Sequence, residues 1–191
     1  MHYELMQRLW YRSGKQEDYV KNHVLPSENS RILDIGCGTG NLVPLLKFRK
    51  YVGFDLNPLY IRRARSRGIN NCEFYTADVV ENQKIEPGSF DIVMANGILH
   101  HLDDDQCKIL LQTAHEALCR GGRLVTRDGC ILPQQTRLER WLLMNDRGPF
   151  VRTPEQYEEL VRSVFKSYTS VIRSDLLRTP YSMIIFSCMR S

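Results

Sequence analysis

The feature that most constrains the fold is the stretch from Arg31 to Gly40, which reads Arg-Ile-Leu-Asp-Ile-Gly-Cys-Gly-Thr-Gly. Its apolar first half predicts a buried strand, and the glycines that follow predict a tight turn. Because glycine has no Cβ, the backbone of this turn can let a ligand lie directly against it. A leucine pattern over residues 42–46, which includes Pro44, predicts a helix directly after the turn. Together these features predict a nucleotide-type site at the carboxyl end of a strand.

The spacing of the glycines separates two classes of ligand. A dinucleotide-binding fingerprint, G-x-G-x-x-G, has its third glycine at the position that Asn41 occupies here. This chain has G-x-G-x-G instead, and Asp34 precedes the first glycine, Gly36, by two residues. A carboxylate at that point would repel a pyrophosphate and attract an ammonium group. The pattern therefore favours a nucleoside that carries a zwitterionic amino-acid tail.

Residues Leu33 to Gly40 resemble motif I of the class I S-adenosylmethionine-dependent methyltransferases. The resemblance covers nearly the whole chain, and it implies that S-adenosylmethionine is the cofactor and S-adenosylhomocysteine the product. It also implies that the carboxylate of Asp78 accepts from the adenine amine, and that the next backbone N–H meets a ring nitrogen. The expected cofactor-binding residues are Asp34, Gly36, Cys37, Gly38, Gly40, Asp55, Leu56, Asp78, Val79 and Asn96.

Acidic residues follow the first three predicted strands. The second strand, residues 51–55, ends in Asp55, which lies 19 residues beyond Gly36. This is close to the offset of about 20 at which an acid binds the ribose hydroxyls in Rossmann-type sites. A carboxylate can accept hydrogen bonds from both hydroxyls at once. Asp78 follows the third strand, residues 72–76, so three acids are expected along one edge of the sheet.

The alternation of strands and helices predicts an α/β fold, a Rossmann-like three-layer α/β/α sandwich around a seven-stranded, mainly parallel sheet. The last two strands, expected over residues 166–173 and 181–189, have a link too short for a parallel crossover, so the last strand should be antiparallel. We expect one methyltransferase domain over residues 1–191. Residues 1–28 would form a helical cover, and residues 129–153 an insertion after the fifth strand that serves as a substrate lid.

Composition limits the class of protein and the cellular compartment that we expect. Hydrophobic residues make up 42% of the chain and charged residues 25%, which is ordinary for a globular protein. Six cysteines without a C-x-x-C pair predict reduced thiols in a cytoplasmic protein. No apolar run is long enough to span a membrane, and no set of residues has metal-ligand spacing. The sequence leaves the oligomeric state open.

The sequence Leu-His-His-Leu over residues 99–102 follows the fourth strand and resembles the small-molecule branch of the family. The Asn/Asp-Pro-Pro-aromatic tetrapeptide that amino-methylating branches often have here is absent. We therefore expect direct in-line methyl transfer to a small-molecule acceptor. His101 is the predicted general base if the acceptor must lose a proton. The alternative is a histidine that only shapes the pocket.

Three residues are predicted to contact the substrate: Tyr11 in the cover, and Arg147 and Arg152 in the insertion. Arginines beside aromatic residues such as Trp141 and Phe150 suit a carboxylate or phosphate on a small acceptor. Solvated arginines without a binding role are the alternative reading.

Two other functions remain open. Arginines at positions 62, 63, 65 and 67 suggest an RNA or tRNA methyltransferase. Because no aromatic residue interleaves with these arginines, a solvated helix face is favoured over nucleic-acid binding. The net charge of +4 is mild and does not by itself argue for nucleic acid. A non-catalytic S-adenosylmethionine-binding partner protein is the second alternative.

Overall fold

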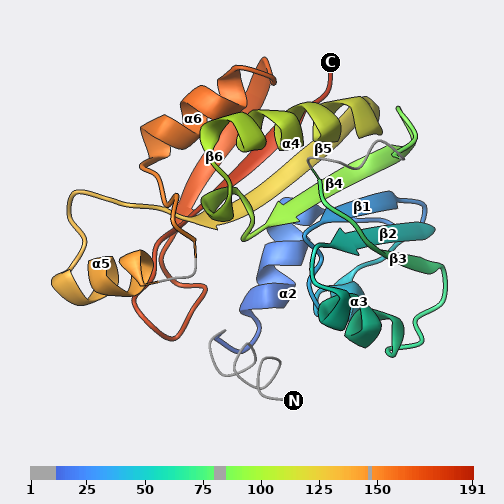
Figure 1. Ribbon diagram of the computed structural model, residues 1–191, viewed down its shortest axis with the longest axis horizontal. Helices are drawn as coiled ribbons and strands as arrows, with labels where there is room; N and C mark the ends of the chain where they lie inside the picture. The colour runs from blue at the N-terminus through green and yellow to red at the C-terminus, as the bar shows by residue number, and fades with distance from the viewer. Residues whose placement is uncertain (1–11, 80–84, 146–147) are drawn as a thin grey trace.

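The computed structural model describes residues 12–79, 85–145 and 148–191, and it is organised around one seven-stranded sheet (Figure 1). The strand order is β3-β2-β1-β4-β5-β7-β6. The strands are β1 (Arg31–Ile35), β2 (Lys50–Asp55), β3 (Cys72–Thr76), β4 (Phe90–Asn96), β5 (Leu118–Gly129), β6 (Ser167–Arg173) and β7 (Met183–Met189). The α-helices are α2 (Lys15–Tyr19), α3 (Pro58–Arg65), α4 (Asp104–Ala117), α5 (Arg137–Met144) and α6 (Pro154–Arg162).

The direction of the strands confirms the predicted mixed sheet. The pairs β1–β2, β1–β4, β2–β3 and β4–β5 are parallel. Strand β7 runs antiparallel to both of its neighbours, β5 and β6. The carboxyl ends of β1, β2, β4 and β5 therefore lie along one edge of the sheet, which we call the carboxyl edge.

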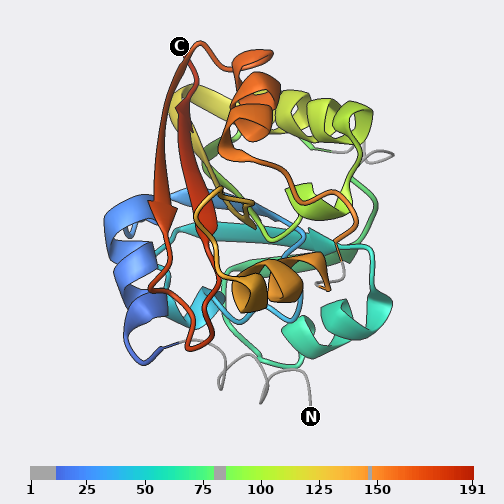
Figure 2. The ribbon, with the colours of Figure 1, turned by 90° about the vertical axis from the view of Figure 1, so that its left-hand side faces the viewer.

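Helices cover both faces of the sheet, as Figures 1 and 2 show. Because side chains alternate along a strand, Leu33 and Leu124 pack in the core under α4 and α6, whereas Ile32 and Val125 pack in the core with α2 and α3. Helices on both faces bury most residues of the central strands β1 and β4, which explains why their sequences are largely apolar.

Helix starts follow the predicted capping chemistry. The Asn57 side chain accepts from the Leu59 N–H, with Pro58 in the first helical position. Asp103 and Thr153 each form a capping box at the start of α4 and α6.

The predicted helix after the glycine turn is wrong: the structure has only a single 3₁₀ turn, η2 (Val43–Leu45). Leu46 is already extended, and β2 begins at Lys50, so too few residues remain for an α-helix. In the cover predicted over residues 1–28, α2 continues into a π-helical turn, η1 (Val20–Val24), which ends at Leu25 with a φ of 51°. Residues 1–11 of this cover lie outside the described residues.

Strand β5 begins directly after α4 ends at Ala117, where Leu118 pairs with Phe90. Within the described residues, the longest and most apolar helices fall short of what a bilayer crossing requires.

Candidate functional site

The glycine turn after β1 is fixed to the end of β2. The N–H groups of Gly36 and Cys37 both donate to the carbonyl oxygen of Phe54, at 2.9 and 3.0 Å. Gly36 has a φ of 72°, and a Cβ there would lie 2.9 Å from the Ile98 side chain. Gly38 has a φ of 56° and open space where a Cβ would stand. The turn therefore needs glycine for its backbone shape at both positions, and it leaves room beside Gly38 for a ligand.

Asp55 joins the end of β2 to this turn. Its Oδ2 accepts from the Gly38 N–H at 2.9 Å, and its Oδ1 accepts from the Asn57 N–H at 2.8 Å. The carboxylate is half-buried. Each oxygen has a second lone pair available to a ribose hydroxyl, so the predicted role is compatible with the geometry. The anchoring of the glycine turn by Asp55 is an additional role that the sequence did not suggest.

Asp34 lies beneath the turn and is only 4% exposed. The Tyr51 hydroxyl donates to its Oδ2 at 2.6 Å. Burial raises the pKa of Asp34 to about 7, although the Tyr51 hydrogen bond opposes this shift, and the negative charge of Asp55 adds to it. Near neutral pH this site therefore exchanges a proton, and a cation beside it would favour the carboxylate form.

The remaining predicted cofactor residues lie at the ends of neighbouring strands. Asp78 is half-buried just beyond β3, followed by the buried Val79, and Leu56 is 68% exposed just beyond β2. Asn96 ends β4, and its Oδ1 accepts from the Tyr19 hydroxyl at 2.5 Å. Among the described residues, the buried Asn96 Nδ2 has no hydrogen-bond acceptor. The carboxyl edge thus carries polar groups on four adjacent strands.

The cover contributes residues that the sequence did not single out. Tyr19 is fully buried in α2, and the guanidinium of Arg127 lies 4.1 Å from the centre of its ring. Arg173 in β6 donates to Asp18 at 2.9 Å and to Asp175 at 2.6 Å. These contacts hold α2 against the sheet, so the cover is part of the site's wall. Tyr11, the predicted substrate residue of the cover, lies outside the described residues.

The two histidines after β4 have different surroundings. His100 is 6% exposed, and its Nδ1 lies 2.9 Å from the Asp128 Oδ1. His101 is exposed, and its ring centre lies 4.2 Å from that of His100. Asp128 is 1% exposed, and its Oδ2 has no donor among the described residues. No sequence signal pointed to Asp128 as a partner of His100.

The insertion packs against His100. The Phe150 N–H donates to the His100 carbonyl at 3.0 Å. A Cβ on Gly148 would clash with the His100 ring and its backbone oxygen, so only glycine fits at this point. Gly148 and Phe150 therefore hold the end of the insertion against His100.

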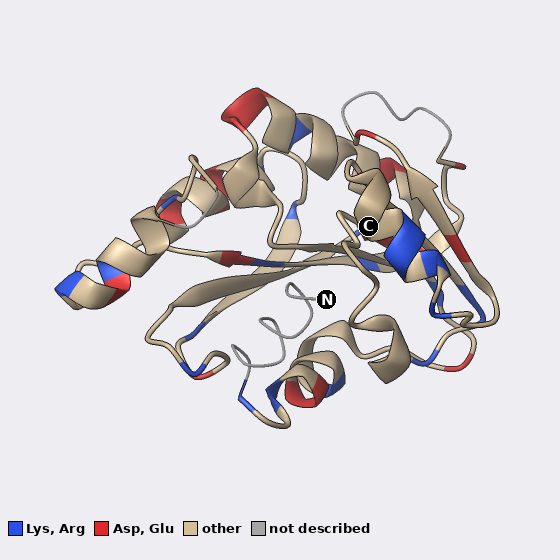
Figure 3. Ribbon diagram, turned by 60° about the horizontal axis from the view of Figure 1, so that its bottom comes forward, with Lys and Arg blue, Asp and Glu red and all other residues tan. Residues whose placement is uncertain are grey.

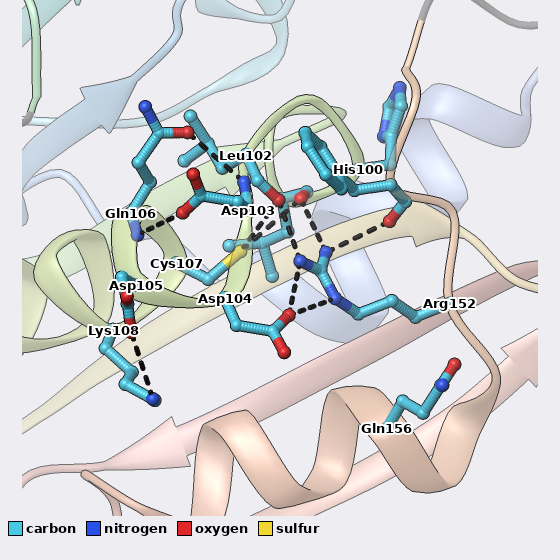
Figure 4. Close-up of polar contacts among 12 residues, drawn as sticks. His100, Leu102, Asp103, Asp104, Asp105, Gln106, Cys107, Lys108, Arg152 and Gln156 are labelled. Atoms are coloured by element: carbon cyan, nitrogen blue, oxygen red, sulfur yellow. Dashed lines mark hydrogen bonds and ion pairs between the residues drawn. The ribbon is translucent and has the colours of Figure 1, made fainter.

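Arg152 is the clearest correction to the predicted substrate residues. Its Nε and Nη2 donate to the Asp104 Oδ1, its Nη1 to the carbonyls of Leu99 and Phe150, and its Nη2 also to Leu102 (Figure 4). These bonds use all five guanidinium donors, and the side chain is 7% exposed. Arg152 therefore fastens the insertion to the start of α4 and has no donor left for an acceptor. Arg147 lies outside the described residues.

The arginine-rich helix α3 is partly explained by intramolecular contacts. Arg65 donates to the Phe74 carbonyl at 3.0 Å, and Arg67 donates to the Thr39 carbonyl at 2.7 Å. Arg67 thereby supports the glycine turn from outside. Arg65 and Arg67 are thus engaged within the fold.

Comparison with known proteins agrees with this geometry. The fold is shared with phosphoethanolamine N-methyltransferase 2 of Haemonchus contortus at a TM-score of 0.77 and 16% identity, over 93% of this chain and 52% of that one. It is also shared with geranyl diphosphate C-methyltransferase of Streptomyces coelicolor at a TM-score of 0.73 and 14% identity, over 92% and 80% of the two chains. The seven-stranded Rossmann-like fold predicted from the sequence is therefore confirmed.

The sequence comparisons point to the same class. Residues 32–122 match the family model described as a methyltransferase domain. An uncharacterized methyltransferase of Schizosaccharomyces pombe is 32% identical over 117 residues, which are 59% of this chain and 45% of that protein. The chain spans about half the length of the curated relatives that it matches first. The matched residues run from β1 into β5, so the family match includes the glycine turn and the carboxyl ends of β2, β3 and β4.

Proposed function

We propose that this chain binds S-adenosylmethionine at the carboxyl edge and transfers its methyl group to a small-molecule acceptor. The observation that carries the proposal is the link between Asp55 and the Gly38 N–H, which joins the acid after β2 to the glycine turn after β1. Solved structures of the same fold hold S-adenosylhomocysteine with phosphomonomethylethanolamine or with geranyl diphosphate. Those acceptors are small and anionic, which supports the acceptor class predicted from the sequence.

The residues of the site fit an adenosyl amino acid. Gly38 leaves space against the backbone, the two oxygens of Asp55 suit the ribose, and Asp34 suits the ammonium group. Asn96 Nδ2, buried and without an acceptor among the described residues, suits an oxygen of the amino-acid tail. When bound, the cofactor supplies the methyl group on its sulfonium sulfur, and the thioether that leaves is neutral. The chain has to hold the acceptor in line with it and exclude water.

If the acceptor must lose a proton, the arrangement around Asp128 favours His100 over His101 as the base. The Asp128 carboxylate accepts from Nδ1, so Nδ1 carries the proton and Nε2 has the basic lone pair. Asp128 is then a positioning residue. His101 is exposed, and its ring lies against that of His100.

Calorimetry with S-adenosylhomocysteine tests the cofactor site. Asp55→Asn should weaken binding, whereas Asp105→Asn, at an exposed acid on α4, should leave it unchanged. Equal affinities for the two variants would contradict the placement of the ribose.

Turnover of methyl-labelled S-adenosylmethionine with an extract of small metabolites then tests the acceptor class. Label in a small molecule supports the proposal. Label only in added RNA favours the alternative of an RNA methyltransferase, and binding without any transfer favours a non-catalytic cofactor-binding protein.

A further inference from the structure

Helix α5 exposes an unusual amount of apolar surface. Leu138 is 58% exposed, Trp141 60% and Met144 63%. Because they are spaced three residues apart, these side chains lie on one side of the helix. Arg137 and Arg140 are exposed as well. We call these five residues the outer face of α5.

The inner side of α5 is firmly attached to the protein. Leu143 is fully buried in a cluster with Leu177 and Tyr181. The Ser182 hydroxyl donates to Glu139 at 2.5 Å, which turns the one acid of the helix away from the outer face. The orientation of α5 is therefore fixed, and its apolar side chains face outward because the fold holds them there.

The position of α5 in the molecule suits a docking element. It stands out at one end of the protein in Figures 1 and 3, and Figure 2 shows it in front of the sheet. Figure 3 shows basic residues at the projecting end of the helix. A seven-residue segment, 130–136, connects the carboxyl end of β5 to α5.

We propose that the outer face of α5 docks onto an anionic lipid surface. Leucine, tryptophan and methionine side chains of a surface helix enter the boundary between headgroups and acyl chains, and the tryptophan ring is well suited to that boundary. Arginines on the same helix pair with lipid phosphates. The outer face carries two positive charges and no acid, so it is complementary to anionic headgroups. This inference does not depend on the proposed function.

The test uses the full chain with Trp10→Phe, which leaves Trp141 as the one tryptophan. Vesicles of phosphatidylcholine alone are compared with vesicles of an equimolar mixture of phosphatidylcholine and phosphatidylglycerol. We expect a blue shift of the Trp141 emission and co-sedimentation with the anionic vesicles. Both should be much weaker with the neutral vesicles and should decline as salt is added.

Two variants and a matched control separate the contributions. Trp141→Glu should lower the partition coefficient for anionic vesicles about tenfold or more, because a charge replaces the largest inserting side chain. Arg137→Glu combined with Arg140→Glu should abolish the preference for anionic over neutral vesicles. Ile172→Glu, at a 42% exposed residue of the edge strand β6, should bind as the parent does. Melting temperature and S-adenosylhomocysteine affinity, measured on every variant, separate this proposal from folding and from the proposed function.

Three results would overturn the proposal. The first is a parent protein that does not bind anionic vesicles, or that binds them equally well with Trp141→Glu. The second is self-association without lipid that Trp141→Glu abolishes, which would assign the outer face to a second copy of the chain. The third is an emission shift of Trp141 with S-adenosylhomocysteine but not with vesicles, which would place this face inside the cofactor site.

Discussion

The substitution Asp34→Asn isolates the energetic cost of the buried acid beneath the glycine turn. Asparagine has nearly the same shape and can still accept the hydrogen bond that the Tyr51 hydroxyl donates to Asp34. It cannot ionise. The variant therefore removes one property only, the charge that Asp34 acquires above its pKa.

The size of the effect follows from the shifted pKa. The pKa of Asp34 is raised from 3.8 to about 7, chiefly by burial. Between these values the unfolded chain has lost its proton and the folded chain keeps it, so the free energy of unfolding falls as the pH rises. The stabilisation is complete below the ordinary pKa and is lost as the pH passes through about 7. Over that window the loss for this one group is about 4 kcal/mol at most.

Urea denaturation of the parent and of Asp34→Asn, at a series of pH values from strongly acidic to mildly alkaline, measures this difference. The other titrating groups are common to both proteins and cancel in the comparison. We expect the variant to gain stability relative to the parent as the pH rises from 3.8, with the gain levelling off once the pH has passed about 7. A difference in stability that is independent of pH would refute the assignment of a buried, proton-exchanging acid.

The same acid should couple the cofactor to pH. If an ammonium group binds beside Asp34, it lowers the pKa of this carboxyl, so binding below neutral pH releases a proton. Calorimetry of S-adenosylhomocysteine in buffers of different ionisation enthalpy should reveal that release in the parent and not in Asp34→Asn. A release that persists in the variant would come from another group.

Three further substitutions test the geometry of the site. Asp55→Ala removes both the proposed ribose contact and the anchor of the glycine turn, and it should cost about 1–3 kcal/mol of calorimetric affinity for S-adenosylhomocysteine; an unchanged affinity would contradict it. Arg152→Ala leaves buried carbonyls unpaired and should lower the free energy of unfolding in urea by about 2–3 kcal/mol, without the selective rise in acceptor KM that a substrate contact would produce. Gly148→Ala forces a Cβ into the ring of His100 and should cost about 1–3 kcal/mol of stability, whereas a variant as stable as the parent would show that the loop yields.

Local sequence signals were sufficient for most of the fold. The strand around Leu33 depends on burial, and the helix caps at Asp103 and Thr153 depend on contacts within a few residues. Both kinds of signal can be recognised in a sequence. The helix predicted after the glycine turn does not form, because the start of β2 limits the number of residues available to it. That start is set by pairing within the sheet, which a local pattern does not reveal. The leucines of that segment pack in the core without forming an α-helix.

Long-range partners explain the errors at the site. Arg152 was interpreted as a substrate residue because it follows an aromatic residue in an insertion. Its role depends on Asp104, 48 residues away, and on the carbonyl of Leu102, 50 residues away, which no local pattern specifies. The contact of Tyr19 with Asn96 joins positions 77 apart in the chain, and it was missed for the same reason.

The choice between His100 and His101 shows what the fold adds to a motif. Both follow β4, and a neighbouring pair of identical residues carries no signal for which side chain points inward. The difference comes from Asp128, whose side chain is on the face of β5 that packs beneath the start of α4, within reach of His100 Nδ1.

If His100 is the base, His100→Asn should reduce the rate of methyl transfer and remove the acidic limb of its pH profile, while His101→Asn should retain both the rate and the limb. Asp128→Asn should lower the rate without changing cofactor affinity, because it acts only through the tautomer of the imidazole. Loss of methyl transfer with His101→Asn alone would instead assign the role of general base to His101.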